Sequence, residues 1–126
     1  MKEELERILA QRQKQYINDA KRVAAAVLIP LFQKQGQYHI ILIRRTEKVK
    51  DHKGQIAFPG GARDNDDRTL LHTAVRESRE EIGLRMKDIE VIGELDDELT
   101  TTTNYTVTPF VAVIPWPYRF RKTEDE

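Results

Sequence analysis

The sequence predicts an α/β domain that combines apolar, β-rich runs with helical segments. One helix is indicated in residues 67–82 by positions at 3.6-residue spacing, namely Leu71, Val75, Ser78 and Ile82. Apolar runs rich in strand-forming residues lie on both sides of it, at residues 22–32, 38–44, 89–95 and 105–114. A chain of 126 residues is long enough for one domain with a buried core, and it contains no internal repeat or long linker.

The other predicted elements follow in chain order. Residues 2–20 are predicted to form a polar, amphipathic helix whose apolar stripe begins at Leu5 and Ile8. The segments 22–32 and 38–44 are predicted strands, and the polar, glycine-containing link between them indicates a hairpin. The remaining elements are a loop at 47–54, a short strand at 55–58, and strands 89–95 and 105–114 on either side of the threonine run at 100–103.

The helix at 67–82 carries recognisable end signals. Asp67 or Thr69 can act as its N-cap, because both side chains accept a hydrogen bond from a backbone N–H of the first turn. Gly83 suits the residue after the last turn, and Leu84 can make the apolar contact that follows a left-handed cap. We therefore expect a loop, a helix and a defined stop.

Three carboxylates lie on this helix at positions i, i+3 and i+4: Glu77, Glu80 and Glu81. These positions share one helix face, where like charges repel by roughly 0.2–0.5 kcal/mol per pair. Taken alone, such a string is most often a solvent-exposed face, and we expect this face to be solvated in the absence of metal. A hard divalent cation bound through oxygens would relieve the repulsion. The glycine pair at 60–61 predicts a turn where backbone can approach a ligand closely.

Residues 61–84 resemble the Nudix hydrolase signature, G-x5-E-x7-R-E-U-x-E-E-x-G-U, in which U is a bulky apolar residue. Its fixed positions are matched by Gly61, Arg76, Glu77, Glu80, Glu81, Gly83 and Leu84. The chain departs from the signature at two places. Asp67 stands for the first glutamate, with one extra residue before Arg76, and Ser78 replaces the apolar U. Because Ser78 is small and lies on the core face, it needs a close neighbour. The two departures leave the acidic face unchanged, because the three glutamates keep their mutual spacing.

A second motif narrows the resemblance. Residues 41–61 are similar to the signature upstream of this box in the coenzyme A pyrophosphatase branch, roughly L-L-T-x-R-S-x3-R-x3-G-x3-F-P-G-G. The matching residues are Ile41, Leu42, Arg45, Gly54, Phe58, Pro59, Gly60 and Gly61. Thr46 and Lys50 are conservative replacements, while Ile43 departs from the branch's threonine. The resemblance covers about residues 22 to 115.

The resemblance implies a fold. It is a Nudix-type α/β/α sandwich with a mixed sheet, in which residues 1–126 form one Nudix hydrolase domain and residues 1–20 a helical N-terminal extension. The family usually continues with a C-terminal helix and a closing strand, which this sequence lacks. Either the chain is a fragment, or the N-terminal helix covers the surface that the missing helix would cover. Glu124 or Glu126 would lie near the late loop from which the family often takes a further acidic ligand or base.

The resemblance also implies metal-dependent hydrolysis of a phosphoanhydride. Glu77, Glu80, Glu81 and the carbonyl of Gly60 would hold Mg²⁺ or Mn²⁺, Arg76 would orient the glutamates, and Glu77 is also a candidate base. Zinc is not expected without cysteine or a histidine pair. Coenzyme A would yield 3′,5′-ADP and 4′-phosphopantetheine. The alternatives are another nucleoside diphosphate-linked substrate, such as ADP-ribose, NADH, a nucleotide sugar or capped RNA, and a non-catalytic Nudix module that binds a nucleotide or a protein partner.

A basic stretch over residues 44–53 precedes the glycine pair. Its Arg45, Lys50 and His52 are candidates, with Gly60 and Gly61, for binding the substrate phosphates. Arg45 is the best single candidate, because a guanidinium can grip phosphate oxygens bidentately. The alternative is a solvated basic loop.

Composition adds expectations about location and partners. The 21 basic and 21 acidic residues balance, so steering toward nucleic acid is not expected. The absence of cysteine suits a reducing, cytoplasmic environment, and the N-terminus has no apolar stretch of the kind found in signal peptides. The longest apolar run, 23–32, is interrupted by Pro30 and is too short to span a bilayer. A nucleotide-like small molecule is the expected partner, and homodimerisation is left open.

Overall fold

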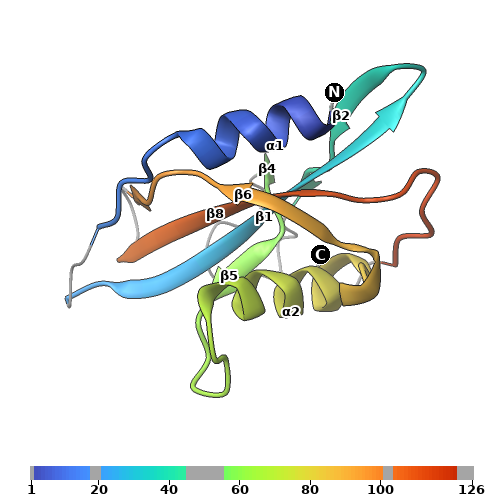
Figure 1. Ribbon diagram of the computed structural model, residues 1–126. Helices are drawn as coiled ribbons and strands as arrows, with labels where there is room; N and C mark the ends of the chain where they lie inside the picture. The colour runs from blue at the N-terminus through green and yellow to red at the C-terminus, as the bar shows by residue number, and fades with distance from the viewer. Residues whose placement is uncertain (1, 18–20, 45–55, 101–103, 122–126) are drawn as a thin grey trace.

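The computed structural model describes residues 2–17, 21–44, 56–100 and 104–121 (Figure 1). In chain order the elements are α1 (Lys2–Gln11), β1 (Val23–Lys34), β2 (Gln37–Ile40), β3 (Ile43–Arg44), β4 (Ile56–Ala57), β5 (Gly60–Ala62), α2 (Leu70–Ile82), the 3-10 helix η1 (Met86–Asp88), β6 (Glu90–Glu94), β7 (Glu98–Leu99) and β8 (Tyr105–Val113). The chain combines helices with a mixed sheet, so the predicted α/β class is confirmed. No helix in the described ranges is both long enough and apolar enough to cross a membrane.

The main sheet is mixed, as expected. Its central path is β2-β1-β8-β6, with β5 also paired to β1 and β7 also paired to β8. β1 and β8 run parallel from Val23↔Tyr105 to Leu31↔Val113, and the other pairings of this sheet are antiparallel. The long, apolar β1 and β8 therefore form the centre of the sheet, where strands are buried on both faces.

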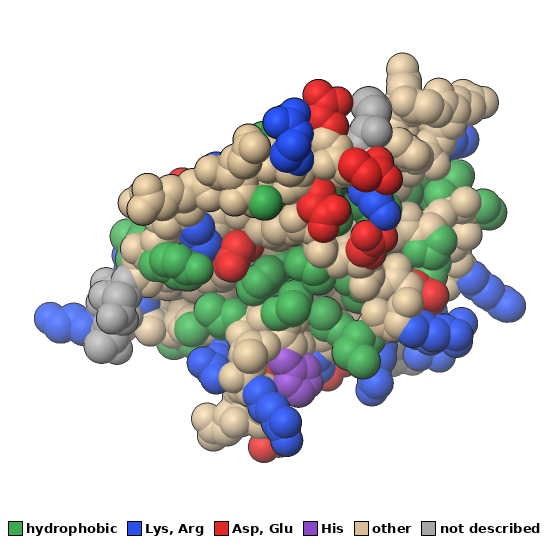
Figure 2. Space-filling view, in the orientation of Figure 1, with side chains coloured by type: hydrophobic (Ala, Val, Ile, Leu, Met, Phe, Trp, Pro, Cys, Tyr) green, Lys and Arg blue, Asp and Glu red, His purple; other side chains and the backbone are tan. Residues whose placement is uncertain are grey.

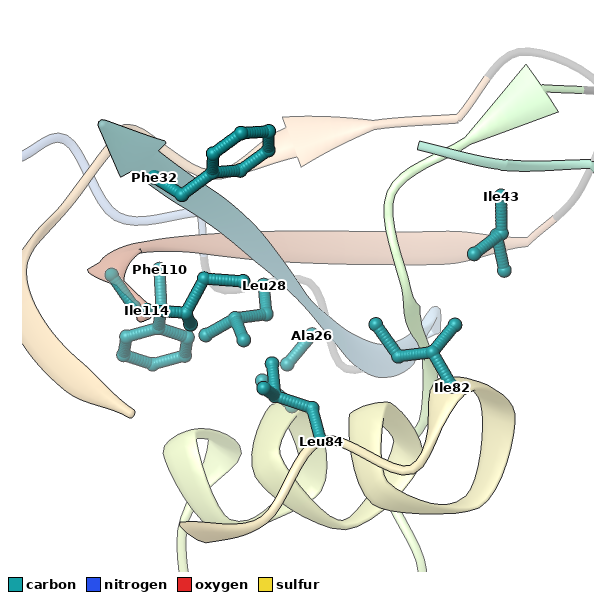
Figure 3. Packing of buried hydrophobic residues seen from close by; sticks show 10 residues of the cluster. Ala26, Leu28, Phe32, Ile43, Ile82, Leu84, Phe110 and Ile114 are labelled. Atoms are coloured by element: carbon teal, nitrogen blue, oxygen red, sulfur yellow. The ribbon is translucent and has the colours of Figure 1, made fainter. Parts of the chain in front are cut away.

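Each face of the sheet is covered by a helix, which gives three layers (Figure 1). On the α2 side, the core combines residues of β1, β8 and α2 with Leu84, as Figure 3 shows. On the opposite side, Leu31, Ile92 and Val111 pack with Leu5 and Leu9 of α1. Figure 2 shows hydrophobic side chains along the middle of the molecule, between the two helical layers. The α/β/α sandwich is confirmed, and α1 covers the face opposite α2.

The predicted hairpin between the first two strands is present. Lys34 pairs with Gln37, and the two linking residues both have positive φ, 55° at Gln35 and 79° at Gly36. Positive φ at both central positions is typical of a tight type I′ turn. The predicted strand over 38–44, however, is split in two. β5 occupies the edge of β1 beyond Pro30, so β2 ends at Ile40, and β3 pairs instead with β4 in a separate two-stranded sheet.

The helix predicted over 67–82 begins later, at Leu70. Of the two N-cap candidates, Thr69 is the cap, and its side chain accepts the His72 N–H at 3.1 Å. At the other end Gly83 has φ 73° and donates its N–H to the Arg79 carbonyl, and Leu84 is fully buried. Ser78 is fully buried too, and its hydroxyl donates to the Ala74 carbonyl at 2.8 Å. The hydroxyl is thus satisfied within the helix.

The helix predicted over 2–20 is wrong in extent, because α1 ends at Gln11. The next residues run along the segment that follows β6, where two acidic side chains accept their backbone N–H groups. Asp96 accepts from Gln15 at 2.9 Å, and Asp97 accepts from Ile17 at 3.0 Å. These bonds replace the helical ones. Strands β6 and β8 lie where 89–95 and 105–114 were predicted, while β7 and η1 were not foreseen.

Candidate functional site

The glycine pair lies in β5 and not in the predicted turn. Gly60 and Gly61 pair with Val27 and Ala26 of β1, and the buried Pro59 accepts the Leu28 N–H at 2.8 Å. A Cβ on Gly60 would lie 2.6 Å from the Val27 Cα and would also collide with the Ala26 carbonyl oxygen. The glycine at this position therefore lets β5 pair closely with β1, directly beside α2.

The three glutamates of α2 differ in their exposure. The Glu77 and Glu80 side chains are 20% and 51% exposed, whereas Glu81 is buried. Its Oε1 accepts the Gly60 N–H at 2.9 Å. The expectation that the whole acidic face is solvated is therefore wrong for Glu81. Glu81 sits between the exposed acids and the core face of the helix, and it ties α2 to the start of β5.

Arg76 bridges the acidic residues of the site. Its Nε and Nη2 donate to the two carboxylate oxygens of Asp67, each at 2.9 Å. Its Nη1 lies 3.3 Å from Glu80 and 3.5 Å from Glu77. These contacts, Asp67 first among them, raise the pKa of Arg76 above its usual value. Asp67 thus holds one edge of the guanidinium group, and the other edge faces Glu77 and Glu80.

Asp67 is the buried anchor of this arrangement. Its carboxylate is 1% exposed and also accepts the Thr73 hydroxyl and the Asp64 N–H, each at 2.9 Å. The Arg76 hydrogen bonds and the Asp64 N–H hold the pKa of Asp67 well below its usual range, although burial opposes them. From the sequence, Asp67 was expected only as a residue of the signature or as the N-cap. Its place in the signature was the signal that could have paired it with Arg76.

The donors of the site suit a hard cation chemically. Glu77, Glu80 and Glu81 supply carboxylate oxygens from one helix, which Mg²⁺ and Mn²⁺ prefer. A Cβ on Gly61 would lie 2.7 Å from the Glu77 Cδ, so this glycine leaves room for the Glu77 carboxylate. Within the described part of the chain, no three acidic or histidine side chains converge in a preformed metal site. The reason is that Glu80 is turned to Arg76 and Glu81 to Gly60.

The structure does not describe the remaining predicted residues. Arg45, Lys50 and His52 fall outside the described residues, as do Glu124 and Glu126. The structure thus brings Arg76 and the glutamates together with the glycine pair, and the roles assigned to the basic stretch stay predictions. So does the ligand role of the Gly60 carbonyl.

Comparison with known proteins supports the family that the sequence resembles. The NUDIX domain family matches residues 21–126. A curated relative from Klebsiella pneumoniae, an uncharacterized Nudix hydrolase called NudL, is 40% identical over 102 residues, which are 81% of this chain and 52% of NudL. Similar NudL proteins of other enteric bacteria show 39% to 41% identity. The chain spans about half the length of these curated relatives.

Solved structures share the fold. A C. elegans Ap4A hydrolase in a binary complex superimposes with a TM-score of 0.67 at 18% identity, covering 82% of this chain and 74% of that one. The NUDIX domain of Shewanella oneidensis NrtR complexed with ADP ribose superimposes with a TM-score of 0.60 at 15% identity, covering 83% and 75%. At such identities the likeness concerns the fold alone. The family match over residues 21–126 shows that the chain belongs to the Nudix domain family.

Proposed function

We propose that this protein hydrolyses a phosphoanhydride bond with the help of Mg²⁺ or Mn²⁺, and that coenzyme A is its substrate. The observation that carries the proposal is the arrangement around α2. Arg76, anchored by Asp67, faces Glu77 and Glu80, and Glu81 holds the Gly60 N–H beside them. Nudix hydrolases generally use such divalent ions. An arginine that positions several glutamates supports a metal site, because metal ligands must be held in place. A solvated helix face has no such requirement.

The roles of the residues in this proposal are those that the Nudix resemblance implies. Glu77, Glu80 and Glu81, with the Gly60 carbonyl, would hold the ion, which supplies polarisation of a phosphoryl oxygen, charge neutralisation and a lowered pKa for water. Arg76 positions the two exposed glutamates. Glu77 is a candidate base as well as a ligand, because its carboxylate is partly exposed and can reach a water molecule.

The choice of coenzyme A rests on the upstream motif. Residues 41–61 are similar to the signature of coenzyme A pyrophosphatases, and the basic residues within it, Arg45 and Lys50 among them, would meet a substrate that carries a 3′-phosphate as well as a pyrophosphate. The expected products are 3′,5′-ADP and 4′-phosphopantetheine. A different nucleoside diphosphate-linked substrate is the second candidate, favoured by neighbours in fold that include an Ap4A hydrolase and a domain complexed with ADP ribose.

A product scan tests the proposal. Coenzyme A, ADP-ribose, NADH, Ap4A and capped RNA are each incubated with the protein and Mn²⁺ or Mg²⁺, and the products are separated by chromatography. We expect cleavage of coenzyme A at the pyrophosphate, abolished in Glu77→Gln. Faster turnover of ADP-ribose or Ap4A would refute the substrate and leave the reaction type standing. Binding of a nucleotide without turnover of any compound would favour the non-catalytic module.

A comparison of two related substrates sharpens the choice. We expect coenzyme A to be cleaved at least about tenfold more efficiently than dephospho-coenzyme A, a preference that needs only about 1.4 kcal/mol in the transition state. One charge-assisted contact is worth that much. The preference should shrink as salt rises, because exposed charges are screened over about 8–10 Å. Arg45→Ala should remove most of the preference, and Arg45→Lys should restore it only in part, because lysine lacks the bidentate fork. Equal efficiencies for the two substrates would defeat the assignment.

A further inference from the structure

A second charged site lies at the C-terminal end of α2. A cavity of about 970 Å³ opens there between α2, η1 and the segment that follows β8. Its lining residues are Arg79, Gly83, Arg85, Met86, Arg119, Phe120 and Arg121. Four of these seven residues are arginines, and no acidic residue is among the described residues that line the cavity. This volume lies within the range of about 300–1,000 Å³ typical of ligand pockets.

The walls of the cavity are held in place by hydrogen bonds. The Arg121 N–H donates to the Ile82 carbonyl at 2.7 Å, which attaches the C-terminal segment to the end of α2. The Tyr118 hydroxyl accepts the Arg85 N–H at 3.0 Å and donates to Asp88 at 2.7 Å. Asp88, the acidic residue of η1, is therefore engaged with Tyr118. The segment 118–121 is thus fixed to the two elements that form the other walls.

The arginine side chains do not cap the carbonyl groups at the helix end. Cationic side chains often stabilise a helix C-terminus by binding its last carbonyl groups. Here the carbonyls of Ser78, Arg79 and Ile82 already accept backbone N–H groups from the residues that end the helix or cross it. Among the described residues, none of the four lining arginines donates a side-chain hydrogen bond or forms an ion pair with a carboxylate. All four are exposed.

Four like charges around one cavity repel each other, and an anion bound among them would relieve that repulsion. Phosphate is an anion that guanidinium groups match well, since they can donate two parallel hydrogen bonds to its oxygens. Met86 and Phe120 add an apolar surface to the same cavity. The lining therefore fits a ligand that combines several phosphate charges with an apolar or aromatic part.

The cavity is distinct from the glutamate site. Each residue turns an α-helix by about 100°, which places Arg79 roughly 160° around the helix axis from Glu77. The glutamate site lies beside β5, whereas the cavity lies past Ile82, where the C-terminal segment crosses α2. We propose that the four-arginine cavity is an anion-binding site, separate from the glutamate site, and that it binds a polyphosphorylated compound of the nucleotide type. This inference does not depend on the proposed hydrolase activity.

Calorimetry with inorganic tripolyphosphate tests the proposal. The protein is used in metal-stripped buffer at low ionic strength, where the glutamate face is acidic and does not attract the probe. We expect Arg85→Gln/Arg119→Gln to weaken binding by at least about tenfold. The matched control, Arg7→Gln/Arg68→Gln, removes the same charge from exposed positions outside the cavity and should change binding less than about twofold. Equal loss in both variants, or no binding by the unaltered protein, would overturn the site.

Further probes identify the ligand. ADP should compete with tripolyphosphate, whereas tighter binding of a short single-stranded oligonucleotide, lost in the same variant, would assign the phosphates to nucleic acid. Tighter binding of an oligoglutamate peptide would overturn the phosphate assignment. The charge-preserving Arg85→Lys/Arg119→Lys variant should bind with intermediate affinity, because the charge remains and the fork is lost. Thermal unfolding of each variant checks that the fold is retained, as expected for exposed positions.

Discussion

Substitution by alanine should affect different properties at the two adjacent glycines of β5, stability at Gly60 and activity at Gly61. In Gly60→Ala the new Cβ meets backbone, 2.6 Å from the Val27 Cα, where an ordinary carbon contact needs about 3.5–4.0 Å. In Gly61→Ala it meets the side chain of Glu77 instead, 2.7 Å from the Cδ. Backbone in a paired strand can yield only by disturbing the sheet, whereas the end of a glutamate side chain can rotate away.

The magnitudes follow from these two contacts. Relieving an overlap of about 1 Å within the β1–β5 pairing should cost Gly60→Ala about 1–3 kcal/mol of stability, the range of overpacked cores. For a domain of this size that corresponds to a Tm lower by roughly 3–15 °C. Gly61→Ala should cost less than about 1 kcal/mol, the price of one displaced rotamer. A carboxylate displaced by about 1 Å should nevertheless lower kcat roughly 100-fold.

Each variant serves as the control for the other. Thermal unfolding reports the stability of each variant, and the proposed hydrolysis of coenzyme A with Mn²⁺ reports the state of the glutamate site. The expected pattern is a destabilised Gly60→Ala protein beside a stable but poorly active Gly61→Ala protein. Two results would refute the reasoning about Glu77. One is a Tm for Gly61→Ala below that of Gly60→Ala, and the other is a kcat for Gly61→Ala equal to that of the unaltered protein.

Substitutions at three further positions test other contacts of α2. Glu81→Gln keeps an oxygen for the Gly60 N–H and should stay folded while losing turnover, whereas Glu81→Ala should also lose about 1–3 kcal/mol of stability, measured by urea unfolding. Because the folded pKa of Asp67 is depressed, its contribution to stability is present above the unfolded pKa near 3.8 and is lost as pH falls toward the folded pKa. Asp67→Asn should therefore flatten the dependence of stability on pH below about pH 4, and an unchanged slope would contradict the ion pair with Arg76. Thr69→Ala should cost about 0.5–2 kcal/mol through loss of the N-cap, and equal stability would show that another residue caps α2.

Local signals in the sequence were sufficient to place α2. Apolar spacing and the glycine after the helix predicted its course and its C-cap, and Thr69 was one of two N-cap candidates, because each of these signals depends on residues within one or two turns. The alternating apolar runs likewise predicted β1, β2, β6 and β8. Features within reach of local periodicity were therefore largely predictable.

Features that depend on distant partners were not predictable from the sequence. Gly60 and Gly61 indicate a turn locally, but their pairing with β1 makes them a strand. Glu81 looks like its exposed neighbours until the Gly60 N–H is placed beneath it. Propensity alone would continue α1 beyond Gln11. Its end is explained by contacts with the carboxylates after β6, which lie at least 80 residues away along the chain.

That N-terminal segment bears on where the domain can be cut. The family match begins at residue 21, yet the segment before it contributes Leu5 and Leu9 to the packing on Leu31, Ile92 and Val111. Lys14 lies 2.9 Å from Asp97, a carboxylate only 7% exposed. A chain shortened to the matched residues would therefore open an apolar face to solvent and strip a buried acid of its cation. In physical terms the folding unit includes α1, which lies upstream of the boundary that sequence similarity draws.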